Sequence, residues 1–179
     1  MLIMDAVLEV GDTADFVLWP IADVPAYQFV RLSSRMSSLE VGTATATLTD
    51  YNSAASGNDV PALDASEPVR RLTEAERVIA PGGLRVRDSD AGTEISPGCC
   101  SGLEDWREWF ILLDGEVPWL GHSPTPRVEH AGRVVRLWPD GGDAEGPSPD
   151  HPVEIAVADI LGLLRTVQGE LSGFVSAVE

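Results

Sequence analysis

The stretch VEIAVADILGLLRTVQGELSGFVSAVE, residues 153–179, contains the clearest structural signal in the sequence. Residues 153–157 form a short apolar run typical of a strand, and Asp159 is of a type that commonly begins a helix. The apolar side chains that follow fall on one helical stripe: Ile160, Leu164, Val167, Leu171, Phe174 and Val178. The sequence therefore predicts a final strand followed by a long C-terminal helix.

Three glycines lie inside this predicted helix, at Gly162, Gly169 and Gly173. Each costs about 1 kcal/mol relative to Ala in a helix interior, so the helix depends on its packed apolar face. A glycine also leaves room for a neighbouring strand to approach closely.

Short apolar runs joined by turn residues recur in the rest of the chain and are typical of antiparallel hairpins. The predicted pairs are 4–10 with 15–21, 84–88 with 93–96, and 127–130 with 133–138. Residues 43–49 alternate Thr with apolar residues, which predicts one more strand.

Two shorter helices are predicted between these strands. One covers residues 69–80 and ends at a Pro-Gly-Gly run. The other begins at Ser101, because Ser101 and Glu104 have the S-x-x-E spacing of a capping box, and ends at Gly115. Its buried stripe is expected to comprise Leu103, Trp106, Phe110 and Leu113, widened by Trp109.

These patterns predict the α+β class, with a mostly antiparallel sheet built from hairpins and two or three helices packed on it. Residues 1–179 are expected to form a single domain, since the first half has too little apolar sequence for a core of its own. Residues 50–68 and 139–152 are rich in polar residues, Gly and Pro and are predicted surface loops. The first loop is the alternative boundary between two lobes.

The chain is strongly acidic, with 29 Asp and Glu residues, 12 basic residues and a formal net charge of −17. Every basic residue is Arg, which excludes lysine chemistry such as Schiff-base formation. DNA, RNA and anionic membranes would repel such a chain, so no nucleic acid and no membrane is expected as a partner. A basic protein partner fits better, and the alternative is that the charge only maintains solubility.

The N-terminal residues MLIMDAVLEV lack a positively charged segment, and Asp5 and Glu9 interrupt their apolar character, so no signal peptide is expected. The longest apolar run of interest, residues 109–113, is far shorter than the roughly 20 residues that cross a bilayer. Both observations predict a cytoplasmic location.

The only cysteines, Cys99 and Cys100, are adjacent in the chain. Their Cα atoms are only about 3.8 Å apart across a trans peptide, so we expect reduced thiols, one buried and one partly exposed. Neighbouring side chains on an extended backbone point different ways, which makes a poor metal chelate. Both thiols precede a predicted helix N-terminus, where a thiolate nucleophile can be activated.

Trp119 and His122 share a proline-rich segment, residues 117–126. A tryptophan outside a regular element is a candidate surface anchor. His122 is a candidate general acid or base, because imidazole titrates near neutral pH, and the alternative is a hydrogen-bonded turn residue. Asp105 and Glu108, which face away from the predicted helix stripe, complete the candidate binding residues.

A mixed shell of His122 with Glu104, Asp105, Glu108 and Glu129 could hold a metal, but neither H-E-x-x-H nor C-x-x-C spacing occurs. The G-x-S-x-G, Walker A and G-x-G-x-x-G motifs are also absent from the sequence. We therefore expect no metal and no cofactor.

Four segments together resemble a group of small acidic actinobacterial proteins without assigned function. They are PGCC at 97–100, GLEDWREW at 102–109, PWLGH at 118–122 and LW at 137–138. The resemblance covers roughly the C-terminal half and implies no catalytic residue. In size and acidity the chain is similar to immunity proteins that neutralise basic toxins.

The sequence thus favours a non-enzymatic acidic binding or inhibitor protein, similar to immunity proteins, for a basic protein partner. The alternative is a thiol- or metal-dependent hydrolase that uses Cys99 or Cys100 with His122.

Overall fold

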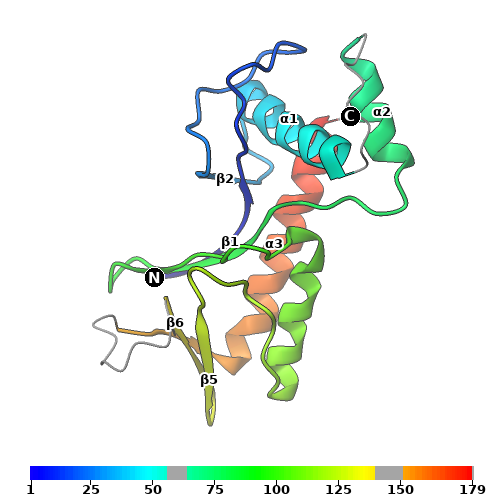
Figure 1. The fold of residues 1–179 in the computed structure, drawn as a ribbon. Helices are drawn as coiled ribbons and strands as arrows, with labels where there is room; N and C mark the ends of the chain where they lie inside the picture. The colour runs from blue at the N-terminus through cyan, green and yellow to red at the C-terminus, as the bar shows by residue number, and fades with distance from the viewer. Residues whose placement is uncertain (56–63, 140–150, 179) are drawn as a thin grey trace.

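The structure is a computed structural model, and the residues that it describes are 1–55, 64–139 and 151–178. These residues form two antiparallel sheets and four helices (Figure 1), which confirms the predicted α+β class. In chain order the elements are β1 (Leu2–Glu9), β2 (Phe29–Arg31), α1 (Ser38–Ala55), α2 (Ser66–Glu74), β3 (Gly82–Asp88), β4 (Thr93–Ile95), the 3₁₀ helix η1 (Leu103–Asp114), β5 (Arg127–Ala131), β6 (Val134–Trp138), β7 (Val153–Ala156) and α3 (Val157–Val178).

The strands are divided between two sheets, with the orders β2-β1-β3-β4 and β5-β6-β7. β1 pairs antiparallel with β3 on one edge and with β2 on the other. The β1–β3 pairing joins segments about 80 residues apart, from Leu2 opposite Asp88 to Leu8 opposite Gly82. A long-range pairing of the N-terminal strand therefore organises the first sheet.

Two of the three predicted hairpins are confirmed. β3 and β4 pair across a turn in which Gly92 has a φ of +68°, and β5 and β6 pair across a turn in which Gly132 has a φ of +67°. Glycine adopts this left-handed conformation without the cost that a Cβ imposes.

The predicted hairpin of residues 4–10 with 15–21 is wrong. β3 pairs with residues 2–8 on one edge of β1 and β2 pairs with residues 7–9 on the other, so the end of β1 from which the hairpin would start is already occupied. These residues instead reach α1, where the Trp19 indole N–H donates a 2.8 Å hydrogen bond to the carbonyl of Gly42.

The strand predicted over residues 43–49 is also wrong, because these residues lie in α1. The hydroxyls of Thr43 and Thr45 donate to the carbonyls of Leu39 and Val41, one turn earlier, at 3.0 and 2.9 Å. These bonds satisfy the hydroxyls inside the helix. The side chains of the stretch are buried on most sides, which hides the helical period: Thr43, Ala44, Thr45, Ala46, Thr47 and Thr49 are all buried.

A capping box that the sequence analysis missed begins α1. The N–H of Ser37 donates to Glu40 Oε2 at 2.8 Å, and the N–H of Glu40 donates to Ser37 Oγ at 3.3 Å. The hydrogen bonds from Ser37 hold the pKa of Glu40 below its usual value. The S-x-x-E spacing of Ser37 and Glu40 could have identified this helix start from the sequence.

η1 begins near the predicted position but has a different buried stripe. A 3₁₀ helix has about 3 residues per turn, so every third side chain shares a face. The buried residues follow this spacing: Leu103, Trp106, Trp109 and Leu112. Phe110 is half-buried and Leu113 is exposed, so their predicted places in the stripe are wrong.

The capping box predicted at the start of η1 is wrong as well. Gly102 is the N-cap of the helix and no side chain caps it. The Glu104 carboxylate instead accepts the N–H of Ala80 at 2.9 Å, which ties η1 to the segment before β3.

α2 starts and ends earlier than the predicted helix of residues 69–80. Asp64 Oδ1 accepts the N–H groups of Ser66 and Glu67 at 2.8 and 3.1 Å, so the first turn forms before Pro68. Residues 50–55 and 66–68 are helical, which corrects both ends of the predicted 50–68 loop. Residues 56–63 of that loop and residues 140–150 of the second loop lie outside the described residues.

α3 packs against both sheets and beside η1 (Figure 1). It begins at Val157, two residues before the predicted start, and buries most of the predicted stripe: Ile160, Leu164, Val167 and Phe174. Leu171 is half-buried and Val178 is exposed, so the buried stripe ends at Phe174. Among the residues that the structure describes, no helix has the length and apolar character needed to span a membrane.

One cluster of buried side chains connects the two sheets. It includes Leu8 and Val86 of the first sheet together with Leu137 and Ile155 of the second. The apolar stripe of α3 belongs to the same cluster. The two sheets and the C-terminal helix therefore share one core.

A buried carboxylate on β1 binds arginines from both neighbouring strands. The Asp5 side chain is only 1% exposed and lies 2.8 Å from Nε of Arg31 on β2 and 2.6 Å from an Nη of Arg87 on β3. An Nη of Arg85, also on β3, lies 3.8 Å away. The positive charges compensate for the removal of the carboxylate from water.

Asp5→Asn should lower the free energy of unfolding by about 2–4 kcal/mol, because three guanidinium groups lose their shared counter-charge while they remain partly solvated. Urea denaturation followed by tryptophan fluorescence measures the loss. Glu154→Gln is the control, since its 2.8 Å pair with Arg136 lies at the surface and should contribute less than about 1 kcal/mol. Equal losses in the two variants would contradict the importance assigned to Asp5.

The glycines of α3 give a matched pair of substitutions. A Cβ at Gly169 meets nothing within 4 Å, so Gly169→Ala should raise the free energy of unfolding by about 1 kcal/mol. A Cβ at Gly173 would collide with the backbone and Cβ of Ser34, so Gly173→Ala should lower it. Thermal denaturation of both variants checks the opposite signs, and the same sign in both would refute the packing of α3 against residue 34.

Candidate functional site

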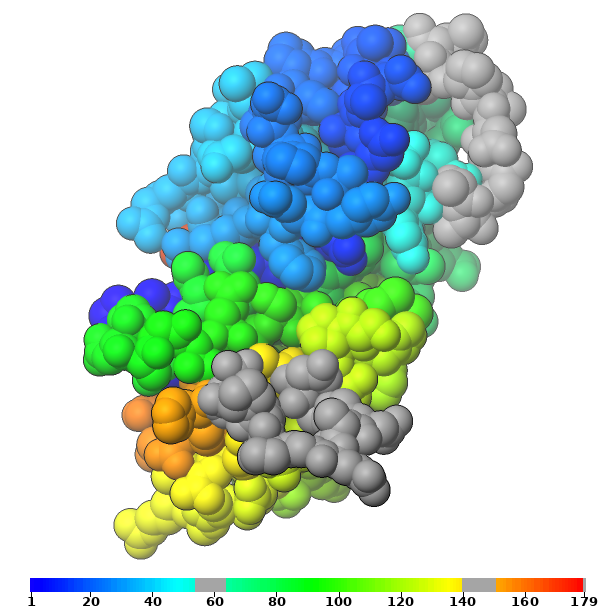
Figure 2. Space-filling view, turned by 60° about the vertical axis from the view of Figure 1, so that its left-hand side comes forward, coloured from blue at the N-terminus to red at the C-terminus, as the bar shows by residue number. Residues whose placement is uncertain are grey.

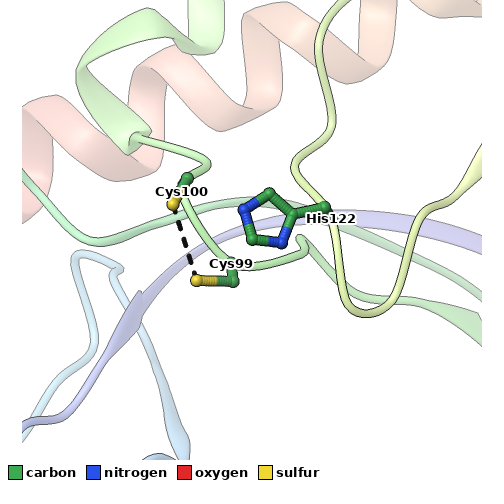
Figure 3. Close-up of side chains that lie close together, drawn as sticks. All are labelled: Cys99, Cys100 and His122. Atoms are coloured by element: carbon green, nitrogen blue, oxygen red, sulfur yellow. Dashed lines mark hydrogen bonds between the residues drawn. The ribbon is translucent and has the colours of Figure 1, made fainter.

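The structure brings Cys99, Cys100 and His122 together at the surface (Figure 3). Cys99 and His122 form an isolated antiparallel bridge between the segment after β4 and the segment before β5. The N–H of Cys99 donates to the His122 carbonyl at 2.6 Å, and the N–H of His122 donates to the Cys99 carbonyl at 3.0 Å. The backbone itself therefore positions the imidazole beside the thiols.

Two glycines permit this close approach of the segments. The N–H of Gly98 donates to the Leu120 carbonyl at 2.8 Å, next to the Cys99–His122 bridge. A Cβ on Gly98 would lie 2.6 Å from the His122 nitrogen, and a Cβ on Gly121 would lie 2.6 Å from the Gly98 carbonyl carbon. The sequence analysis did not select these glycines, although each immediately precedes a residue that it did select.

The two thiols lie on the same side of the chain. Cys100 has a φ of +63°, so the backbone is not extended and the two Sγ atoms are 3.6 Å apart (Figure 3). Both side chains are exposed and no disulfide joins them. The expectation that one thiol is buried is therefore wrong. The expectation that the two side chains point different ways is also wrong, because the left-handed conformation of Cys100 removes the alternation of an extended backbone.

The thiol pair does not have the electrostatics of an activated nucleophile. The hydrogen bond to Cys100, and then the charge that Cys100 gains on ionisation, raise the pKa of the Cys99 thiol above its usual value. The Glu9 carboxylate acts in the same direction. The expected activation by the helix N-terminus is thus not seen at Cys99, and the thiolate fraction at neutral pH is small.

Trp119 lies at the surface beside this cluster, as predicted. Its side chain is 60% exposed, and its indole N–H makes a long 3.4 Å hydrogen bond to the carbonyl of Cys100. Val117 is 54% exposed, whereas Pro118 and Leu120 are buried. The alternation means that Val117 and Trp119 point outward from one extended segment whose other side is anchored in the protein.

The carboxylates chosen from the sequence lie on η1 and do not join the cluster. Asp105, Glu108 and Asp114 are exposed and spaced by multiples of three, so they share one ridge of the 3₁₀ helix. Asp105 lies 3.6 Å from Arg77. Within the described part of the chain, no hydrogen bond or ion pair joins Asp105 or Glu108 to Trp119 or His122.

The mixed carboxylate shell considered for a metal is likewise not assembled. Glu104 is engaged with Ala80, and Glu129 lies on β5. The group that the structure does assemble has two sulfur donors and one imidazole nitrogen donor, all within 4.8 Å of one another. Thiolate and imidazole are ligands that suit Zn²⁺ and other thiophilic ions.

The three side chains of the cluster are exposed. Two hollows of about 540 and 520 Å³ occur elsewhere, the first lined by Trp19 and α1, the second by η1 and α3. Neither is lined by Cys99, Cys100 or His122. In Figure 2 the green and yellow-green part of the chain, which carries both segments of the cluster, separates the blue and cyan residues from the yellow β5–β6 hairpin.

Comparisons of the chain with protein-family models, with curated proteins and with solved structures find no match.

The Cys99–Cys100 contact predicts a specific thiol titration. In reduced, chelator-treated protein, alkylation of Cys99 by iodoacetamide should reach its half-maximal rate at a pH above that of an ordinary thiol, because the neighbouring sulfur raises the pKa of Cys99. Cys100→Ala removes the two largest causes of the raised pKa of Cys99, so the pH of half-maximal alkylation should fall toward that of an ordinary thiol. Peptide mass spectrometry measures the rate at Cys99, and an unchanged or higher midpoint in Cys100→Ala would contradict the coupling.

Proposed function

We propose that this protein is a non-enzymatic acidic binding protein, with the role of an immunity-type inhibitor, whose partner is a basic protein. The observation that carries the proposal is the exposure of Trp119, which projects from an anchored segment with only one long hydrogen bond. The activity requires no cofactor and is assigned to the cytoplasm.

Trp119 has the properties of an interface anchor. Tryptophan is enriched among the residues that dominate binding energy, because it buries a large apolar area and offers one N–H to a partner. Val117 extends the apolar surface, and buried Pro118 and Leu120 hold the segment in place. A pre-ordered anchor of this kind loses little conformational entropy when a partner binds.

Exposed carboxylates on and just after η1 favour a basic partner. Within the described residues, no basic group lies within ion-pair distance of the exposed carboxylates of Glu108, Asp114 or Glu116. Glu116 immediately precedes the segment 117–126 that carries Trp119, and the whole chain has a net charge of −17. Such a field accelerates encounter with a basic protein and disfavours acidic ones.

The second candidate is a hydrolase that uses Cys99 or Cys100 with His122, and the proximity of these side chains favours it. The raised pKa of Cys99 weakens its thiol-dependent form, since little thiolate is present at neutral pH. Slow alkylation of both cysteines at neutral pH, with a rate that rises only near or above the pKa of an ordinary thiol, would retire that form.

Capture of partners from a lysate at low and high salt tests the binding proposal. We expect a basic protein that is retained at low salt and released at high salt, and Trp119→Ala should weaken its binding by at least about 30-fold, as for an interface hot spot. Tyr51→Ala is the control, because Tyr51 is a 46% exposed aromatic residue on a different element, α1.

Retention of an unidentified protein is not sufficient support. The proposal fails when no salt-sensitive basic protein is retained, or when Trp119→Ala and Tyr51→Ala reduce binding equally. Circular dichroism of both variants verifies that a loss does not arise from unfolding.

A further inference from the structure

We infer that Cys99, Cys100 and His122 form a binding site for one thiophilic metal ion, with Zn²⁺ as its natural chemical class. The inference goes beyond the proposed binding function and does not depend on it. It combines ligand chemistry, atomic distances and the fixed backbone of the two segments.

The distance between the sulfurs suits a shared metal ion. Two thiolates that bind Zn²⁺ at about 2.3 Å with a tetrahedral angle lie about 3.8 Å apart. The Sγ atoms of Cys99 and Cys100 are 3.6 Å apart, and the imidazole nitrogen of His122 completes a group within 4.8 Å (Figure 3). Small side-chain rotations therefore bring all three donors to metal-ligand distances.

The backbone provides these positions in advance. The two hydrogen bonds of the Cys99–His122 bridge fix the imidazole-bearing segment against the thiol-bearing one. The left-handed conformation of Cys100 turns its sulfur toward that of Cys99. Ligands that are already aligned lose little entropy on binding, which favours affinity.

A simple thiol–thiol hydrogen bond accounts for only part of this arrangement. It explains the 3.6 Å contact of the sulfurs but gives no reason for an imidazole at the same point. The nearby negative charge of Glu9 also suits a bound cation. Three protein ligands leave the fourth tetrahedral position to water.

Titration of the reduced protein with Co²⁺ tests the site directly. Co²⁺ bound by thiolates gives a near-ultraviolet sulfur-to-metal charge-transfer band and visible bands whose intensity reports tetrahedral geometry. We expect one Co²⁺ per chain and displacement of Co²⁺ by Zn²⁺. Cys99→Ser, Cys100→Ser and His122→Ala should each weaken Zn²⁺ binding by at least about 100-fold, more than is typical for loss of a residue that only supports a ligand.

His151→Ala is the matched control, because His151 is exposed and belongs to no cluster of metal-ligating side chains among the described residues. It should bind Co²⁺ and Zn²⁺ like the unaltered protein. Thermal denaturation of the metal-free variants verifies that each one is folded, and the serine replacements keep the size of the side chain.

The inference is overturned when the charge-transfer band is absent from reduced, folded protein. It is equally overturned when His122→Ala binds as tightly as His151→Ala, because the imidazole would then not be a ligand. The experiment needs no protein partner, so its failure leaves the Trp119 proposal standing, and a failed capture experiment leaves the metal site standing.

Discussion

The antiparallel pairing of β1 with β3 is the interaction on which the rest of the molecule depends. It pairs residues 2–8 with β3, while residues 7–9 also pair with β2, and it buries one face of the sheet against α3 and η1. Asp5 lies opposite Arg85 in this register, so the same pairing creates the buried ion cluster that includes Arg31. A shift by one residue would move Asp5 to the apolar face and Ala6 to the arginines. The same strand register therefore buries the apolar side chains of β1 in the core and brings Asp5 to the arginines.

The candidate metal site depends on this framework through the segment that leaves β4. Residues 98–100 form the turn into η1, and an isolated bridge between Pro81 and Gly102 connects the same turn to the start of β3. The opposing segment ends in β5, which begins the second sheet. The Cys99–His122 bridge therefore joins the chain of one sheet to the chain of the other. Because both sheets share the core cluster, the positions of the donors follow from the global packing.

Local signals were sufficient for the elements that local interactions determine. Turns at Gly92 and Gly132 need a left-handed residue, and α3 shows its stripe in the sequence, so these were predicted. β3, the longer of the two partners of β1, lies about 80 residues away, and the helical period of α1 is hidden because residues on most sides of the helix are buried. At the site, residue chemistry selected the cysteines and His122, but their proximity follows from a non-local bridge and from a positive φ at Cys100. Neither feature has a sequence signature at short range.

The exposed tryptophan and the thiols form one continuous surface, and this has a thermodynamic consequence for the two proposals. The Trp119 indole N–H is bonded to the carbonyl of Cys100, so a partner that buries the indole also changes the water around the sulfurs. A Zn²⁺ ion bound by the sulfurs would displace the protons of the two thiols, so its charge would be balanced by two thiolates at the surface that a basic partner would approach. A metal ion that changes the affinity of the protein for its partner must have its own affinity changed by the partner by the same factor, because binding equilibria at two sites are linked. The acidic field favours both ligands, while the charge of a bound Zn²⁺ is balanced by its two thiolates, so the coupling expected between them comes from the shared contact of the indole with the Cys100 carbonyl and not from charge repulsion.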